Sequence, residues 1–175
     1  MFSIQKCSIP DNALLASYVR DDTYTDCYKT DVEGVVSHAD YVTGFYTTLL
    51  FKLERLILKW VVSRPSTDNE ARQMAEGSID TFSAWYVEGR SENQILMCDF
   101  RNRTRSWLMI SPLLENGVAR TRLYFGSAVV PVRNKQTGRT SLGRSFDALV
   151  GIHKIYSEAL LCSAKSLLMA RYRYR

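Results

Sequence analysis

The chain is poor in histidine and has no closely spaced cysteines, and these shortages exclude the common metal sites. It contains two histidines and four cysteines, and no two of the cysteines follow a Cys-x-x-Cys pattern. The glycine patterns that bind nucleotide phosphates are absent, as are the serine-hydrolase and zinc-protease motifs. We therefore predict neither a metal nor a cofactor.

Long apolar runs and a strong excess of one charge are also missing. No run approaches the roughly 20 apolar residues that span a bilayer, and the first residues do not resemble a secretory signal. The net charge of +5 is small beside the dense basic surface of a nucleic-acid-binding protein. The basic, aromatic run 171–175 is expected to be a solvated helix end. We therefore predict a cytoplasmic protein with reduced thiols, without a membrane span or a nucleic-acid partner.

What the chain does have is an ordinary globular composition with clear amphipathic patterns. Its 175 residues, 46% of them hydrophobic, are enough to bury a core and predict a single domain, 1–175. Ser37 and Thr67 each stand three positions before an acidic residue, which is typical of a helix start. They predict a long helix that ends before Pro65 and a short helix that ends at Gly77. The apolar stripe of the long helix consists of Val42, Phe45, Tyr46, Leu49, Leu53, Leu56, Ile57 and Trp60.

The C-terminal part carries the longest amphipathic helix of the prediction. Its apolar positions recur at three-and-four spacing from about Arg144 almost to the end of the chain. A titratable histidine on the buried face of a closing helix suggests a pocket between this helix and its partner. The stripe consists of Phe146, Leu149, Val150, His153, Tyr156, Leu160, Ala164, Leu167 and Leu168.

Segments rich in aromatic and β-branched residues predict five strands that are separated by polar turns. Asn116-Gly117 indicates a hairpin because both residues tolerate positive φ. That turn would place Trp107 and Tyr124 on one face of the sheet and Phe125 on the other. The predicted strands are Tyr24–Val32, Thr81–Glu88, Gln94–Arg101, Arg103–Ile110 and Arg120–Val132.

Strands followed by a closing helix predict an α+β fold, with an antiparallel sheet packed against the C-terminal helix. This order resembles the helix-grip fold of the START, Bet v 1 and polyketide-cyclase-like superfamily. The resemblance implies a curved sheet that wraps around the long C-terminal helix and encloses a cavity. One long and one short helix would be inserted after the first strand. The chain departs from that fold in having five predicted strands where the fold usually has seven.

A narrower resemblance rests on two short stretches near the ends of the chain. The first is Tyr24-Thr25-Asp26-Cys27-Tyr28, and the second runs from Gly143-Arg144-Ser145-Phe146 to His153. They are similar to sequences of an uncharacterised bacterial family with a domain of unknown function. No activity is assigned to that family, so the resemblance implies only a bacterial protein with a cavity.

His153 is the first candidate for chemistry, because a buried imidazole can act as an acid or base or bind a ligand. We favour the simpler interpretation, a core histidine whose nitrogens are satisfied by neighbouring polar groups. His38 is expected in the exposed first turn of its helix. The basic loop 136–144 precedes a helix and could hold an anion or cover a pocket, although a connector is the simpler interpretation.

Arginines form the second candidate group. Arg101, Arg103 and Arg105 share one face of an extended segment, and Arg120 and Arg122 share a face of its partner. Guanidinium groups in such a set can bind a carboxylate or a phosphate. An outer face paired with acidic residues is the simpler interpretation. The candidate acids are Asp26, Glu54, Glu88 and Asp99.

Three functions fit these features, and binding without catalysis is the one that we favour. The first is a protein that holds a small hydrophobic or amphipathic ligand between the sheet and the C-terminal helix. The second is a cofactor-independent cyclase or hydratase with His153 as its base. The third is a structural protein that forms a homodimer through the face with Trp107 and Tyr124. The predicted ligand-binding residues are His153, Tyr156, Trp85, Trp107, Tyr124, Phe125, Arg105 and Arg122.

Overall fold

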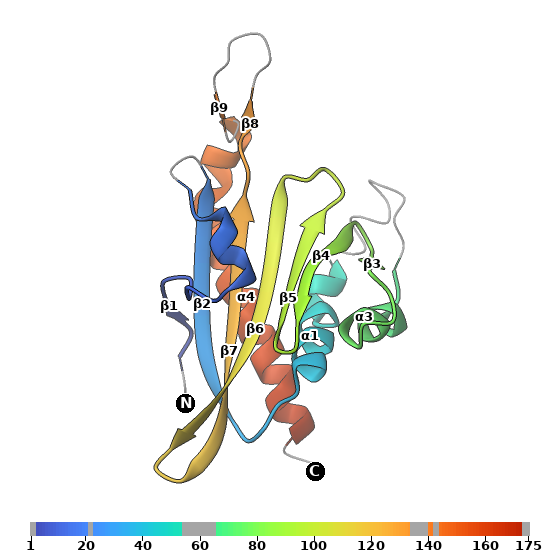
Figure 1. Ribbon diagram of the computed structural model, residues 1–175, viewed down its shortest axis with the longest axis vertical. Helices are drawn as coiled ribbons and strands as arrows, with labels where there is room; N and C mark the ends of the chain where they lie inside the picture. The colour runs from blue at the N-terminus through green and yellow to red at the C-terminus, as the bar shows by residue number, and fades with distance from the viewer. Residues whose placement is uncertain (1–2, 21–22, 54–65, 134–139, 142–143, 173–175) are drawn as a thin grey trace.

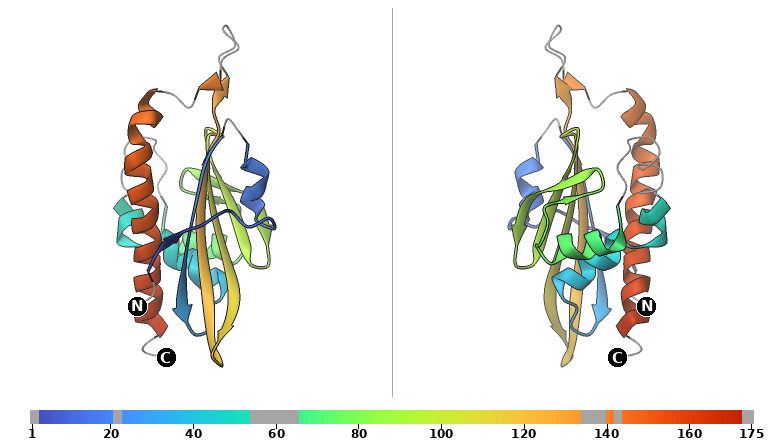
Figure 2. Two further views of the ribbon diagram at one scale, coloured as in Figure 1. Left: turned by 90° about the vertical axis from the view of Figure 1, so that its left-hand side faces the viewer. Right: turned by 90° about the vertical axis from the view of Figure 1, so that its right-hand side faces the viewer.

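A curved antiparallel sheet of seven strands forms the centre of the molecule, and long helices pack on one of its faces (Figure 1, Figure 2). The computed structural model describes residues 3–20, 23–53, 66–133, 140–141 and 144–172, and between 132 and 155 it describes the backbone alone. The strands lie in the order β1-β2-β7-β6-β5-β4-β3. Their bounds are β1 (Gln5–Lys6), β2 (Tyr24–Glu33), β3 (Thr81–Phe82), β4 (Trp85–Ser91), β5 (Gln94–Asp99), β6 (Thr104–Glu115) and β7 (Val118–Val129).

Helices and a small hairpin complete the fold and confirm the predicted α+β class. The long C-terminal helix on an antiparallel sheet is compatible with a helix-grip-like arrangement. No helix in the described part of the chain is both long and apolar enough to cross a membrane. The remaining elements are the 3-10 helix η1 (Leu14–Tyr18), α1 (His38–Tyr46), α3 (Asp68–Ala75), α4 (Arg144–Tyr172), and the hairpin β8 (Val132–Arg133) with β9 (Thr140–Ser141).

The prediction of five strands was wrong, because the sheet has seven. One additional strand is β1, which comes from an N-terminal stretch without a clear pattern. The other arises because the predicted strand Thr81–Glu88 is two strands, β3 and β4, which pair with each other. Ser83 makes the turn between them with a φ of 56°. A two-residue turn inside a run of aromatic and β-branched residues leaves no interruption that periodicity could detect.

The predicted hairpin at Asn116-Gly117 is confirmed and fixes which residues share a face. These two residues have φ values of 52° and 77° and join β6 to β7. Trp107 lies opposite Gly126 in the ladder, and Leu108 lies opposite Phe125. Successive side chains of a strand point to opposite faces, so Trp107 and Phe125 belong to different faces, as predicted.

The helices begin where their capping residues predict. The Ser37 hydroxyl accepts from the amide of Asp40, and Thr67 and Glu70 form a reciprocal capping box. Such side chains satisfy amides that have no partner inside the helix. The predicted C-terminal helix is also confirmed as α4, which stands along the sheet (Figure 2). Of its described apolar stripe, Leu160, Ala164 and Leu168 are buried, and Leu161 beside the stripe is buried as well.

The single long helix predicted after Ser37 was wrong, because α1 ends at Tyr46. Thr47 donates its hydroxyl to the carbonyl of Thr43, and Thr48 accepts from the amide of Phe51 at 3.2 Å. Threonine side chains that bond to the backbone compete with the helical ladder and can cap a new helical turn. Helical structure resumes at 49–53 after this break.

This break changes which side chains are buried. Leu49 and Leu53, which the stripe placed in the core, are 86% and 55% exposed. Phe51 lies in the core instead and is 3% exposed. It packs edge to face on Tyr46, with ring centroids 4.8 Å apart. The interruption of the helix therefore brings an unpredicted ring to the region between the sheet and α4.

The N-terminal segment 7–18 covers the face of the sheet opposite the long helices (Figure 2). Leu15 of η1 and Trp107 of β6 are both fully buried there. The Oε1 atom of Gln94 accepts from Trp107 Nε1 and from the amide of Leu14, each at 2.9 Å. The Gln94 Nε2 group donates to the carbonyl of Asn12. Trp107 is therefore covered by this chain's own residues and is absent from the surface on which the homodimer alternative rested.

Gly126 makes this close packing sterically feasible. A Cβ atom at this position would lie 2.7 Å from Leu15 Cδ2 and 3.0 Å from Trp107 Cε3. Carbon atoms in contact are normally about 3.5–4.0 Å apart. The absence of a side chain at Gly126 therefore allows η1 and the indole ring to approach the strand. The cavity described next lies on the opposite face of the sheet.

Candidate functional site

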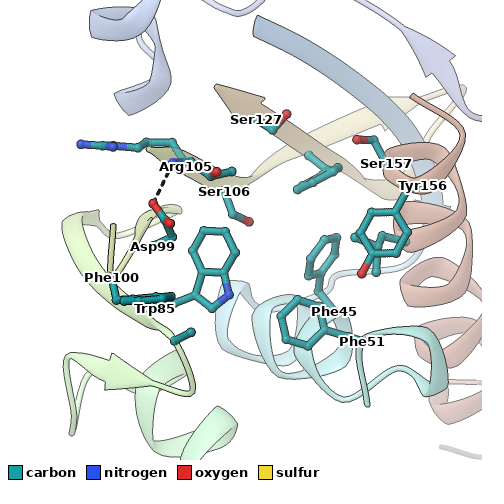
Figure 3. Close-up of a pocket in the computed structure, with 14 residues that line it drawn as sticks. Phe45, Phe51, Trp85, Asp99, Phe100, Arg105, Ser106, Ser127, Tyr156 and Ser157 are labelled. Atoms are coloured by element: carbon teal, nitrogen blue, oxygen red, sulfur yellow. Dashed lines mark hydrogen bonds between the residues drawn. The ribbon is translucent and has the colours of Figure 1, made fainter. Parts of the chain in front are cut away.

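A cavity of about 300 Å³ lies between the helix-covered face of the sheet and the helices α1 and α4 (Figure 3). Its walls come from distant parts of the chain, because α1, the β3–β4 turn, the central strands and α4 all contribute side chains. Aromatic rings make up most of the apolar wall. They belong to Phe45, Phe51, Trp85, Phe100, Phe125 and Tyr156.

One end of the cavity is polar and is built around the buried carboxylate of Asp26. Asp26 on β2 pairs with Ser127 on β7 in the ladder, so their side chains lie next to each other on the same face. Asp26 Oδ1 accepts from the Ser127 hydroxyl at 2.6 Å and from the Ser127 amide at 3.1 Å. Asp26 Oδ2 accepts from the Ser157 hydroxyl of α4 at 3.4 Å. The two serines line the cavity, and Asp26 accepts their hydrogen bonds without lining it.

The carboxylate of Asp26 also affects its tyrosine neighbours. Burial and then the charge of Asp26 raise the pKa of Tyr28 to about 12. The same two causes raise the pKa of Tyr24, whose hydroxyl lies 3.3 Å from Asp26 Oδ2. Both phenols therefore stay protonated at neutral pH and can donate hydrogen bonds.

Two further polar groups lie along the cavity wall. Ser106 shares a hydrogen bond of 3.1 Å with the hydroxyl of Tyr46. Asp99 Oδ1 accepts from the amides of Arg103 and Thr104 at 2.6 and 2.7 Å. Asp99 therefore stabilises the turn between β5 and β6 and places a carboxylate at the edge of the cavity (Figure 3).

Trp85 contributes a polar edge as well as an apolar ring. Its indole nitrogen is buried, and within the described residues it has no hydrogen-bond partner. Figure 3 shows this edge of the ring turned toward the space in front of Phe45 and Phe51. A buried donor without a partner has a cost of about 1–3 kcal/mol, which an acceptor on a bound molecule could offset.

Four of the predicted ligand-binding residues line the cavity: Trp85, Arg105, Phe125 and Tyr156. The head group of Arg105 points away from it (Figure 3). Its guanidinium forms an ion pair of 2.9 Å with Glu88 and lies 4.7 Å from the ring centroid of Tyr18. Arg105 therefore contributes to the wall near its backbone and places no cationic group inside.

Three predicted residues lie on the opposite face of the sheet. Trp107 and Tyr124 pack together under the N-terminal segment, with ring centroids 6.0 Å apart. Arg122 forms a bidentate ion pair with Asp31: Nε donates to Oδ1 at 2.7 Å and Nη2 donates to Oδ2 at 2.9 Å. This pair lowers the pKa of Asp31, chiefly through the hydrogen bond from Arg122. None of the three lines the cavity.

The structure supports the simpler interpretation of the arginines. Arg105, Arg120 and Arg122 are paired with Glu88, Glu115 and Asp31. The shared extended face predicted for Arg101 was wrong, because β5 ends at Asp99 and residues 100–102 form a turn. Asn102 in this turn has a left-handed backbone conformation, with a φ of 57°. These arginines do not converge on one anion.

Several candidates lie outside the described residues or side chains. His153 belongs to the backbone of α4, and its side chain is not among those described. Glu54 and most of the loop 136–144 are also outside, as are the last three residues of the terminal run. The predictions made for them stay predictions.

Sequence reasoning missed Phe45, Phe51, Ser127 and Ser157 as cavity residues. Ser127 carried a usable signal, because it lies two positions after Phe125 on the same strand and therefore on the same face. Its pairing with Asp26 was not predicted. Phe51 carried none, because its position depends on the break after Tyr46. Ser157 depends on how far α4 extends along the sheet, which helical periodicity does not determine.

His38 lies outside the cavity, and burial changes its titration. It begins α1 and is half-buried, so the exposed position predicted for it was wrong. Burial lowers its pKa from 6.5 to about 4, opposed by the carbonyl of Leu108 and assisted by the charge of Arg90. The folded protein therefore holds this imidazole neutral.

Because the unfolded chain binds a proton at His38 more readily, we expect stability to fall as the pH drops from about 6.5 to about 4. The contribution of this group to the slope of the free energy of unfolding against pH approaches about 1.4 kcal/mol per pH unit. Urea unfolding of the wild type and of His38→Asn across this range measures it. The difference between the two proteins should be constant above neutrality and change below it in favour of the variant. Parallel curves throughout would contradict the assignment.

The described residues form no metal site, and comparison with known proteins assigns no function to the cavity. Among the described residues, no group of three or more histidine, cysteine, aspartate or glutamate side chains could hold a metal ion. The chain matches no protein-family model, and no curated protein is significantly similar to it in sequence. The function is therefore inferred from the cavity and the residues that form it.

Proposed function

We propose that this protein binds a small amphipathic molecule in the cavity between the sheet and the helices α1 and α4. The observation that carries the proposal is a space of about 300 Å³ with aromatic walls and a cluster of hydroxyl groups at one end. Ligand sites in proteins are typically concave, mostly apolar, and furnished with a few polar anchors. The opposite face of the sheet is filled by this chain's own N-terminal segment.

We also propose that the chain is a distant member of the helix-grip superfamily. The order of a strand, helices, consecutive antiparallel strands and a C-terminal helix supports this relationship. The last long strand, β7, returns to pair with β2 and closes the wall beside α4. Catalysis remains an alternative prediction that depends on His153, whose side chain lies outside those described.

A cavity-filling substitution tests binding directly. Ala84 lines the cavity and is 4% exposed, so Ala84→Leu should occupy part of the space. Phenylpropanol, an uncharged probe with one ring and one hydroxyl, should raise the Tm of the wild type by about 3–6 °C at about ten times its Kd. The rise should disappear in Ala84→Leu.

The matched control is Ala170→Leu, an exposed position on α4, which should keep the full rise in Tm. No rise in the wild type, or an equal rise in Ala84→Leu, would contradict the proposal. Melting each variant without the probe identifies any loss of fold.

A further inference from the structure

Two of the four cysteines lie next to each other at the N-terminal strand, away from the cavity. Cys7 directly follows β1, and its amide donates to the carbonyl of Cys27 on β2 at 2.9 Å. The register of β1 and β2 pairs Lys6 with Tyr28, so the next position places Cys7 opposite Cys27. Their Sγ atoms lie 3.4 Å apart, and both thiols are free. The two sulfur atoms are therefore in contact across neighbouring segments of the chain.

The backbone at this pair has the geometry that a disulfide requires. Opposed residues at a hydrogen-bonded position of an antiparallel pair have Cα atoms about 5.5 Å apart. That distance lies inside the range of about 4.4–6.8 Å between the Cα atoms of disulfides. The sulfur atoms, now 3.4 Å apart, must approach to a bond length of about 2.05 Å. Small rotations of the two side chains can supply this approach while the strands stay in place.

The two thiols differ in access and in ionisation. Cys7 is half-buried, whereas Cys27 is 1% exposed. The hydrogen bond from Cys27 lowers the pKa of Cys7 to about 7, opposed by burial and assisted by the charges of Lys29 and Arg122. The same hydrogen bond, and then burial, raise the pKa of Cys27. Because the thiolate is the form that attacks a disulfide, Cys7 is the thiol that reacts first with an oxidant from solution.

We infer that Cys7 and Cys27 form a reversible disulfide when the protein meets a small-molecule disulfide. The Cys7 thiolate attacks one sulfur of the oxidant, forms a mixed disulfide and expels the first small thiolate. Cys27 then loses its proton and attacks Cys7 Sγ, which releases the second small thiolate. Two protein thiols are thereby oxidised to one disulfide. The oxidant takes up the two electrons and two protons and is reduced to two small thiols.

The disulfide fastens the segment that covers the Trp107 face of the sheet. Cys7 stands at the beginning of the segment 7–18, and Cys27 belongs to the cluster of buried side chains beneath it. A bond between these two positions restricts the unfolded chain and so favours the folded state. We expect oxidation to raise the Tm by about 5–10 °C.

Peptide mapping after treatment with oxidised glutathione tests the inference. The reduced, native protein is incubated with the oxidant at neutral pH, its free thiols are blocked at low pH, and its tryptic peptides are analysed by mass spectrometry. The peptides 7–20 and 21–29 should be recovered as one species that dithiothreitol separates. A glutathione adduct that persists on Cys7 of the wild type, or no modification of either cysteine, would overturn the inference.

Three variants test the role of each thiol. Cys27→Ser keeps a hydrogen-bond donor beside Cys7 and should accumulate one glutathione on Cys7, because the second thiol that releases it is missing. Cys7→Ser should leave Cys27 unmodified and abolish the rise in Tm. Cys162→Ser is the matched control, because it removes an exposed thiol of α4 and should keep both the disulfide and the rise. An equal rise in Cys7→Ser, or loss of the disulfide in Cys162→Ser, would show that another cysteine carries the reaction.

Discussion

Replacing Trp107 with alanine is expected to lower the free energy of unfolding by about 3–5 kcal/mol. The indole ring is fully buried beneath the N-terminal segment and fills the space between Leu15 and the sheet. Its removal creates a cavity and leaves Gln94, which accepts from Trp107 Nε1 at 2.9 Å, without one of its donors. Urea unfolding followed by circular dichroism measures the loss.

Two further variants separate packing from the hydrogen bond. Trp107→Phe keeps most of the ring and should lose about 1–2 kcal/mol, since it removes the hydrogen bond and part of the contact area. Trp85→Ala should lose clearly less than Trp107→Ala, because Trp85 is only partly buried and borders an existing cavity. A Trp107→Ala variant within about 1 kcal/mol of the wild type would show that the segment does not cover this face.

Replacing Asp26 with alanine is expected to lower the free energy of unfolding by about 2–4 kcal/mol. The substitution leaves the buried amide and hydroxyl of Ser127 without their acceptor. Each buried donor that loses its partner has a cost of its own. Thermal and urea unfolding measure the effect.

Asp26→Asn and Asp80→Ala are the matched comparisons. The asparagine retains one carbonyl oxygen for Ser127 and should recover part of the stability, although not the negative charge. Asp80 has a side chain that is 78% exposed and lies 3.6 Å from Arg90, so its removal should change stability by less than about 0.5 kcal/mol. Equal stabilities for Asp26→Ala and the wild type would contradict the role assigned to this carboxylate.

Local patterns were enough to predict most of the secondary structure. The asparagine–glycine pair at 116–117 sets the register of β6 and β7, and alternation then assigns Trp107 and Phe125 to opposite faces. Capping residues predict the starts of α1 and α3 because their hydrogen bonds are made within one turn of the helix. The break after Tyr46 escaped prediction, because apolar spacing does not report how threonine side chains bond to the backbone.

The candidate site was predictable only in part, because it depends on how distant elements pack. Trp85, Phe125 and Tyr156 could be selected as large side chains on apolar faces, and the structure places all three on the cavity. Trp107 and Tyr124 looked equally suitable. The sequence pattern does not determine which face the N-terminal segment covers, and that segment fills the face on which those two rings lie.

The most direct test of ligand binding in the cavity is the NMR spectrum of the three tryptophan indole groups during a titration with phenylpropanol. Substitution of each tryptophan by phenylalanine assigns the three signals. The indole N–H of Trp85 lies on the cavity wall, whereas that of Trp107 is bonded to Gln94 on the opposite face of the sheet. We predict that the Trp85 signal shifts in a saturable manner while the Trp107 signal stays in place. A Trp85 signal that does not move, or a larger shift at Trp107, would contradict the cavity as the binding site.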